Sequence, residues 1–236
     1  MSDGHHHSED EVEDEVELLA PGWAAIDQRV LSCYPGQVPH QFASRTAYEL
    51  ESQSPLPAIS VVEGAQPEHW HYLTYGLSEL FEKTSNDPAI SGFGFELTMR
   101  TPRGAGEERP PAWPLRFLQA LGRHILSTRE GFDTGHRIDL GGPIVYGGES
   151  ALTGVAIVPD PTLGKIETPF GSLLFLQLVG VTAAELAAMK KLDYEKVVEM
   201  LAELAPRGIT DPARACWTKD PQKSPVVKRY ELGIGF

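Results

Sequence analysis

The sequence is poor in cysteine and has no long apolar run. Cys33 and Cys216 are the only cysteines among 236 residues, so a disulfide scaffold is excluded, and neither lies in a C-x-x-C pair that could hold structural zinc. No stretch of about 18 apolar residues occurs, so we expect no membrane-spanning helix and no membrane partner. The N-terminus is acidic, which argues against a secretory signal peptide. These features predict a cytoplasmic protein.

Common catalytic and nucleotide-binding motifs are also missing. The sequence contains no G-x-S-x-G motif, no P-loop and no dinucleotide-binding G-x-G-x-x-G motif. Glu96 would need a pocket and a perturbed pKa to act as a general base, and we expect an exposed or salt-bridged strand residue instead. We therefore predict that the protein is not an enzyme and has no cofactor.

Lysine and arginine are absent from the first 17 residues, which carry eight acids and account for eight of the thirteen net negative charges. Such a segment cannot bury enough apolar surface to fold, so we predict a disordered acidic tail over residues 1–20 and one domain over residues 21–236. Negative charge repels phosphate backbones, so we expect no nucleic-acid partner. A basic protein partner is favoured, and a purely solubilising tail is the alternative.

The pattern of the remaining residues predicts an α+β fold, with a mixed β-sheet flanked by helices. Phe93, Phe95, Leu97 and Met99 alternate with polar residues, which predicts a strand with one apolar and one polar face. The other expected strands are 58–62, 69–75, 152–158 and 171–179. The expected helices begin at Pro21 and cover 77–83, 115–127, 182–192 and 193–204. Residues 102–114 and 131–148, rich in glycine or proline, are expected to be loops.

Four segments follow one another in a recognisable order. They are EHWHYLTYGLSEL at 68–80, SGFGFELTMR at 91–100 with PPAWP at 110–114, the helix at 119–125, and TPFG at 168–171 leading into FLQLVGV at 175–181. Together they resemble the N-terminal domain of the suppressor of fused family, over roughly residues 21–211. The resemblance implies a protein-binding module. In the animal protein two domains close on an extended partner peptide, which adds as a strand.

The resemblance implies two kinds of partner. Bacterial relatives with a single domain are proposed to be immunity proteins, and because no second domain is expected here, we favour a bacterial-type member that neutralises a toxin by occlusion. The partner would then be a basic toxin or an extended peptide. One alternative is a signalling adaptor that sequesters a regulatory protein, as the animal protein does. A second alternative is a histidine-dependent enzyme or metal-binding domain.

The resemblance also points to candidate partner-binding residues. The peptide-contacting tyrosine and aspartate of the animal protein correspond approximately to His124 and His136 here. These exchanged identities argue against the same ligand, but the positions, together with Arg137, mark a candidate binding surface. Trp113 lies between prolines in an expected polar loop, and it is a candidate interface anchor because tryptophan is enriched in binding hot spots.

Two further histidines are weak candidates for metal ligands. His69 and His71 lie two apart on one expected strand, so they project from the same face, as two ligands of one metal do. The alternative is that both are structural histidines whose ring nitrogens are hydrogen-bonded. We favour that alternative and predict no metal site.

Overall fold

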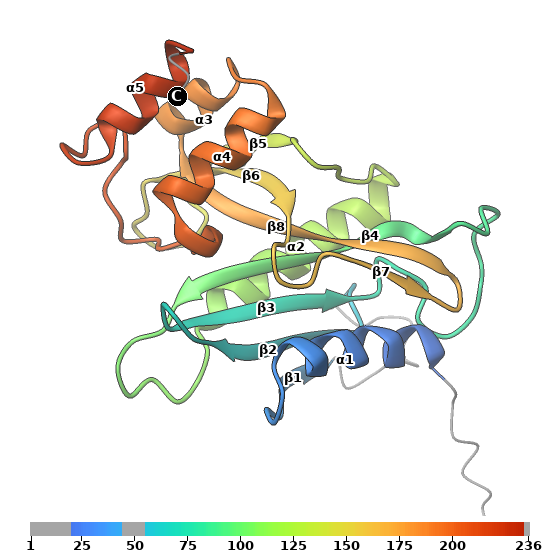
Figure 1. The fold of residues 1–236 in the computed structure, drawn as a ribbon. Helices are drawn as coiled ribbons and strands as arrows, with labels where there is room; N and C mark the ends of the chain where they lie inside the picture. Colours follow the sequence, from blue (N-terminus) through green and yellow to red (C-terminus); the bar gives the residue numbers. More distant parts are fainter. Residues whose placement is uncertain (1–19, 44–54, 234–236) are drawn as a thin grey trace, which may run out of the picture.

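The computed structural model describes residues 20–43 and 55–233, and its centre is an eight-stranded mixed sheet (Figure 1). The strand order is β1-β2-β3-β4-β8-β6-β5, with β7 paired to β8. β4 and β8 are parallel, and the other pairs are antiparallel. The predicted fold class is confirmed. The bounds are β1 His40–Ala43, β2 Ala58–Gly64, β3 His69–Tyr75, β4 Ile90–Pro102, β5 Arg137–Asp139, β6 Leu152–Pro159, β7 Lys165–Thr168 and β8 Gly171–Thr182.

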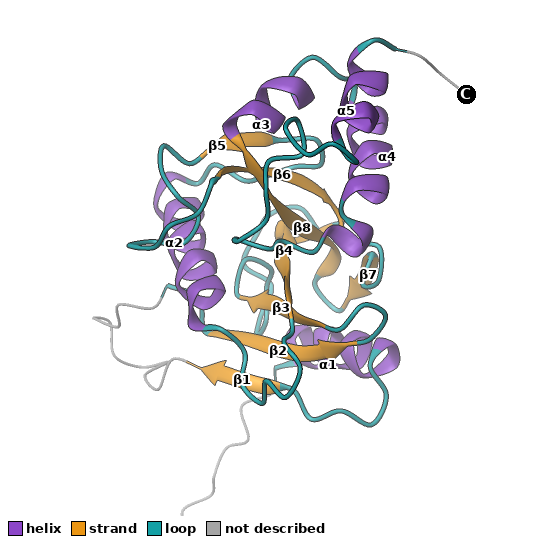
Figure 2. Cartoon of the chain, turned by 90° about the vertical axis from the view of Figure 1, so that its left-hand side faces the viewer, coloured by secondary structure: helices purple, strands orange, loops and turns teal. Residues whose placement is uncertain are grey.

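Helices cover both faces of this sheet (Figure 2). One face packs against α2, and its core includes Leu118 and Ile125 of that helix. The other face carries two separate apolar clusters, one under α1 and one under α3, α4 and α5. The bounds are α1 Pro21–Cys33, α2 Ala112–Thr128, α3 Ala183–Met189, α4 Tyr194–Leu204, the short 3₁₀ helix η1 Pro206–Gly208 and α5 Ser224–Glu231.

Strand β4 is buried on both of its faces. Phe95, Leu97 and Met99 contribute to the core under α2, as the alternation predicts. The alternate residues form the expected polar face, but this face is buried as well, since Glu96, Thr98 and Arg100 have no exposed surface. Glu96 bonds to the turn that follows β3, and Arg100 bonds to Asp160 and to η1. Burial of polar groups requires hydrogen-bond partners, so this face of the sheet is held by polar as well as apolar contacts.

The expected helix at 77–83 is absent, because the backbone groups of this segment bond to distant parts of the chain. Oε1 of Glu96 accepts the N–H groups of Gly76, Leu77 and Ser78 at 2.9–3.1 Å, and Oε2 accepts the hydroxyl of Thr74 at 2.6 Å. Glu96 is therefore neither exposed nor salt-bridged. The carbonyl of Leu77 accepts the N–H of Phe93 at 2.9 Å, and that of Leu80 accepts the N–H of Gly22 at 3.0 Å. The segment therefore forms an irregular turn rather than the i→i−4 bonds of a helix.

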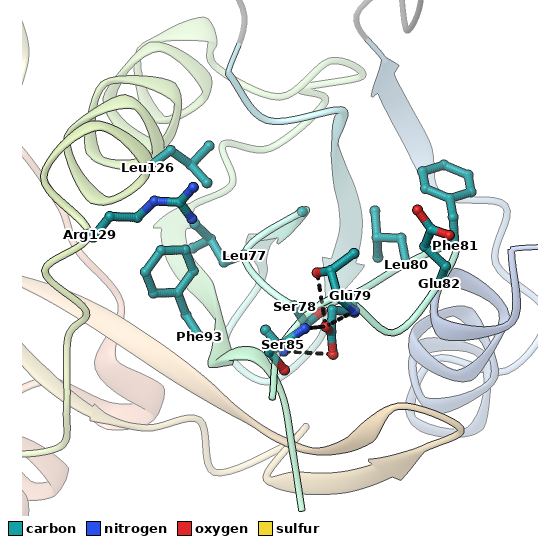
Figure 3. Close-up of a pocket in the computed structure, with 13 residues that line it drawn as sticks. Leu77, Ser78, Glu79, Leu80, Phe81, Glu82, Ser85, Phe93, Leu126 and Arg129 are labelled. Atoms are coloured by element: carbon teal, nitrogen blue, oxygen red, sulfur yellow. Dashed lines mark hydrogen bonds between the residues drawn. The ribbon is translucent and has the colours of Figure 1, made fainter. Parts of the chain in front are cut away.

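A second carboxylate, Glu79, organises the other half of this turn (Figure 3). It accepts the N–H groups of Thr84 and Ser85. It also pairs with Lys83 at 2.8 Å. Burial opposes ionisation of Glu79, but Lys83 and the backbone donors outweigh it and lower the pKa of Glu79 to about 2. The turn, together with Phe93 and the end of α2, surrounds a cavity of about 610 Å³.

The expectations for the acidic tail and for the two cysteines can be compared with the structure in turn. The acidic tail predicted over residues 1–20 falls almost entirely outside the described residues, so it stays a prediction. Cys33 and Cys216 are both half-buried and carry no disulfide. Within residues 20–43 and 55–233, no helix is long and apolar enough to cross a membrane.

We expect Glu96→Gln to change the pH dependence of stability. Burial raises the pKa of Glu96 from 4.5 to about 7, against the hydrogen bonds that it accepts. The native state thus holds this proton more tightly than the unfolded chain, so the contribution of Glu96 is full below pH 4.5 and is lost as pH rises through 7. The variant stays neutral and keeps the acceptor oxygen. The difference in free energy of unfolding, variant minus wild type, should therefore become more positive by about 3 kcal/mol between about pH 4.5 and 7.5. Urea denaturation at the two pH values measures it.

Glu82→Gln is the matched control, because Glu82 is an exposed acid of the same turn. Its free energy of unfolding should follow that of wild type at both pH values. Parallel curves for Glu96→Gln and wild type would show that Glu96 is ionised in the fold throughout this range.

Candidate functional site

Strand β5 forms one edge of the sheet and bonds to β6 on one side only. Ile138 pairs with β6, and the backbone of His136 and Leu140 on either side also bonds to β6 at 2.9 Å. Successive residues of a strand direct their backbone groups to opposite sides, so the N–H and C=O groups of Arg137 and Asp139 face away from β6. No other strand of the described chain pairs with β5. The edge can therefore accept an added strand.

The position of β5 is fixed by the side chain of Arg137. Its guanidinium donates Nη1 to the carbonyl oxygens of Met189 and Leu192, the latter at 2.9 Å, and Nε to that of Gly135 at 3.1 Å. Met189 is the last residue of α3, and a cation is favourable at the C-terminal end of a helix. Arg137 thus holds the edge strand against α3, and its guanidinium is engaged within the chain.

The structure leaves His136 and His124 exposed. Nδ1 of His136 accepts the N–H of Asp133 at 3.2 Å, so in the neutral ring Nε2 carries the hydrogen and can donate to a partner. His124 lies in the last turns of α2, and within the described ranges its ring makes no hydrogen bond. His136 and Arg137 are therefore adjacent on the β5 edge, while His124 comes from a different element.

Trp113 does not join these residues. Helix α2 begins at Ala112, so Trp113 lies in its first turn and not in the polar loop that the sequence predicts. Pro114 is tolerated there, because the first N–H groups of a helix have no intrahelical partner. Trp113 is half-buried against the core under α2. It lies about 16 Å along the helix from His124, by the rise per residue.

Acidic side chains precede and follow β5 in the sequence. Glu130, Asp133, Asp139 and Glu149 are all exposed in the segments that lead into and out of this strand. The carboxylate of Asp139 also accepts the N–H of Gly141 at 2.9 Å, which orders the turn that follows. This local charge attracts a basic partner segment and repels an acidic one.

The four candidate histidines do not converge on one site. His69 and His71 are neighbours in β3, with ring centroids 6.4 Å apart, but both are buried. Nδ1 of His69 bonds to the carbonyl of Pro67 at 2.7 Å, and both nitrogens of His71 have partners. In the described part of the chain, no three histidine, cysteine or acidic residues group as metal ligands do. The structure gives the alternative of an enzyme or metal site no assembled centre.

His71 instead belongs to a buried polar network centred on Asp160, the residue that follows β6. The carboxylate of Asp160 accepts from Arg100 at 2.9 Å, from His71 at 2.9 Å and from Thr98 at 2.7 Å. All four side chains are essentially inaccessible. The carboxylate also accepts the N–H groups of Thr162 and Leu163, so it fixes the turn between β6 and β7.

Burial and the charge of Arg100 determine the protonation state of His71, and Arg100 and His71 keep Asp160 ionised. Nδ1 of His71 accepts the hydroxyl of Tyr34 at 2.7 Å, and Nε2 donates to Asp160. Burial first, and then the charge of Arg100, lower the pKa of His71 to about 4, so its ring is neutral near pH 7. Burial opposes ionisation of Asp160, but His71 and Arg100 together hold its pKa well below the usual range.

The sequence carries only a faint signal for these residues. Asp160 stands between two prolines at the end of an apolar strand, and Arg100 ends the alternating strand. A charged residue at each strand end is compatible with a surface position as well as with a buried pair. Strand β5 is missed for a related reason, since three residues within a glycine-rich stretch are too few to show an alternation.

The comparisons with known proteins agree on one family. The family model of suppressor of fused protein matches residues 52–215. Suppressor of fused homologs of Homo sapiens and Mus musculus are each 34% identical over 193 residues. These matches cover 76% of this chain, which spans only 40% of the length of those relatives.

Solved structures show the same fold. A chain from a Sufu–Fu complex has a TM-score of 0.78 at 29% identity, covering 88% of this chain and 97% of that one. Drosophila Suppressor of Fused has a TM-score of 0.79 at 29% identity, covering 89% and 54%. A SUFU homolog from Neisseria gonorrhoeae, at 16% identity and a TM-score of 0.53 over 83% and 96%, shares the fold.

The eight-stranded mixed sheet with helices on both faces places this chain in the α+β class of folds that these solved structures share. The match over residues 52–215 then assigns the family: this chain belongs to the suppressor of fused family. The resemblance drawn from the four sequence segments is confirmed.

We expect Asp160→Asn to lower the free energy of unfolding by about 3–5 kcal/mol, because the change leaves Arg100 buried without its counter-ion. Chemical denaturation near neutral pH measures this loss. Glu167→Gln is the control, since its pair with Lys165 is exposed and 3.9 Å long, and its effect should be below about 1 kcal/mol. Equal losses for the two variants would mean that Asp160 does not hold the fold.

Proposed function

We propose that this chain is a non-enzymatic, adaptor-type binding module that takes up an extended segment of a regulatory protein along β5. The observation that carries the proposal is the outward-facing backbone of Arg137 and Asp139 at an edge that no described strand covers. The similarity to a chain solved in a Sufu–Fu complex supports a protein partner. The partners of the longer relatives are not assumed to be those of this chain.

Strand addition at this edge explains the roles of the neighbouring side chains. Backbone hydrogen bonds supply sequence-independent affinity, and each contributes only about 1 kcal/mol net. Selectivity then depends on side chains beside the edge. His136 and His124 offer exposed ring nitrogens, and the surrounding acids favour lysine or arginine in the partner segment.

A basic toxin is the second candidate partner, which the chain would neutralise by occlusion. The net charge of −13 supports this immunity hypothesis. The relatives at 34% identity support the adaptor hypothesis better, because they are suppressor of fused homologs. Co-expression distinguishes the two: an immunity protein restores growth to cells that express the toxin encoded beside it, and an adaptor does not.

We expect Asp139→Pro to weaken binding of the partner segment by about tenfold or more, because proline removes an outward N–H without removing a bond to β6. Calorimetric titration with overlapping Fu segments, and with the toxin if one is encoded alongside, measures the change. Asp139→Ala is the matched control, since it removes the carboxylate and keeps the N–H. Its affinity should stay within about threefold of wild type.

Thermal unfolding checks that both variants keep the fold. If Asp139→Pro and Asp139→Ala bind equally well, the partner does not add to β5, and the proposed strand addition is wrong. Protection of the Arg137 and Asp139 amides from hydrogen exchange in the complex gives an independent readout.

A further inference from the structure

A separate cavity of about 480 Å³ lies between the loop that joins β4 to α2, the first turn of α2 and the segment that follows η1. Its apolar lining consists of one alanine, one tryptophan and three prolines, namely Ala105, Trp113, Pro102, Pro111 and Pro212. The acids Glu107 and Asp211 also border it, and none of the described lining residues is a lysine or an arginine. The cavity has no lining residue in common with the β5 edge.

Two walls of this cavity are held in place by hydrogen bonds. The N–H of Glu107 donates to the carbonyl of Gly104 at 3.0 Å, and the carboxylate of Glu107 accepts the indole N–H of the buried Trp70 at 2.9 Å. The hydroxyl of Tyr72, in β3, donates to the carbonyl of Pro111 at 3.0 Å. A cavity whose walls are fixed before binding loses little conformational entropy when it takes up a ligand.

The third wall, after η1, is fixed as well. The hydroxyl of Ser150 donates to the carbonyl of Pro212 at 2.9 Å. One oxygen of the Asp211 carboxylate accepts the N–H of Ala213 at 2.9 Å, and the second oxygen has no partner in the described part of the chain. Asp211 is therefore held at the border of the cavity with one oxygen left for a ligand.

Trp113 has the features of a ligand contact. It is half-buried, packs in part against the core under α2, and also lines the cavity. Its indole N–H has no hydrogen-bond partner within residues 20–43 and 55–233. Proline-rich segments have few N–H groups of their own, so they are recognised through their rings, which pack on aromatic side chains, and through their exposed carbonyls. A tryptophan with an unused N–H, placed among prolines, is complementary to such a segment.

We propose that this cavity is the docking site for a proline-rich segment of a partner protein, bound as a polyproline II helix with arginine or lysine beside the prolines. The proline rings pack on Trp113, the indole N–H donates to a carbonyl of the segment, and the basic residue pairs with Asp211. The two lining acids give the preference for a basic segment. This inference goes beyond the proposed strand addition at β5 and does not depend on it.

Calorimetric titration of the whole chain with three synthetic peptides tests the proposal. The first peptide is a run of eight prolines with an arginine at each end. The second carries glutamate at both ends instead, and the third keeps the arginines but replaces the prolines by alternating glycine and serine. The first should bind saturably and about tenfold or more tightly than the third, because only the prolines are preorganised. It should also bind about threefold or more tightly than the second.

Absence of saturable binding by the first peptide, or equal affinity for either of the other two, overturns the proposal. The third peptide is the control for the negative charge of the chain, which attracts arginine wherever it lies. An excess of the first peptide over the third therefore measures recognition of the prolines alone.

Variants of Trp113 locate the site. Trp113→Ala should weaken the first peptide about tenfold or more, and Trp113→Phe, which keeps an aromatic ring but lacks the N–H, about threefold or more. Trp23→Phe is the matched control, because Trp23 is also half-buried but stacks on Tyr75 beneath α1. It should bind as wild type does. Equal affinities of Trp113→Phe and Trp23→Phe would reject the site.

The indole resonances give a readout that remains usable if Trp113→Ala unfolds. In a ¹H–¹⁵N titration of wild type, the indole signal that is missing from the spectrum of Trp113→Phe should shift with the first peptide. If that signal stays in place while the peptide binds, the prolines dock elsewhere.

Asp211→Asn tests the charge preference, since the amide keeps the oxygen that accepts the N–H of Ala213. The preference for arginine over glutamate ends should fall by about twofold or more. Asp87→Asn is the matched control, because Asp87 accepts the N–H of Ala89 at 2.9 Å in the same way and precedes the opposite end of β4. Its preference should equal that of wild type, and an equal fall in both variants would contradict the pairing with Asp211.

Discussion

The ion pair between Asp160 and Arg100 is the interaction on which the second face of the sheet depends. It lies between the apolar cluster under α1 and the cluster under α3, α4 and α5, so it joins two cores that do not merge. The same carboxylate orders the turn after β6 and binds His71, while Arg100 reaches the carbonyl of Arg207. One buried charge pair thus connects β3, β4, β6 and η1. The pair thus adds directional hydrogen bonds to the strand pairing and apolar packing of this face.

Two buried titratable groups act in opposite directions on this fold. The raised pKa of Glu96 makes its contribution to stability decrease as pH rises toward 7. The lowered pKa of His71 makes its contribution full above 6.5 and lost as pH falls toward 4. The two windows overlap, so the effects largely cancel in the intact chain. The pH dependence that one group gives to the free energy of unfolding becomes visible in a variant that lacks the other group.

The sequence predicts the strong elements of the fold and misses those that depend on long-range contacts. Alternation locates β4, and helical spacing locates most of α2, because both patterns are local. The segment at 77–83 has helical spacing too, but its backbone bonds to Glu96, Phe93 and Gly22, which are distant in sequence. For the candidate site, the resemblance gives the positions His124 and His136. It cannot show that Arg137 is committed to α3 or that Trp113 packs on the core, since both depend on tertiary neighbours.

The parallel pairing of β4 with β8 determines the order in which the chain can assemble. Leu97 lies beside Leu176, about 80 residues later in the sequence, and this pairing joins the strands β1 to β4 to the rest of the sheet. Contacts between such distant residues form only after a long loop has closed, and this closure costs conformational entropy before the contacts stabilise the fold. During synthesis the first four strands emerge long before their neighbour exists, with one side of β4 uncovered. A nascent chain of this family therefore passes through a stage at which chaperone protection of that strand has most effect.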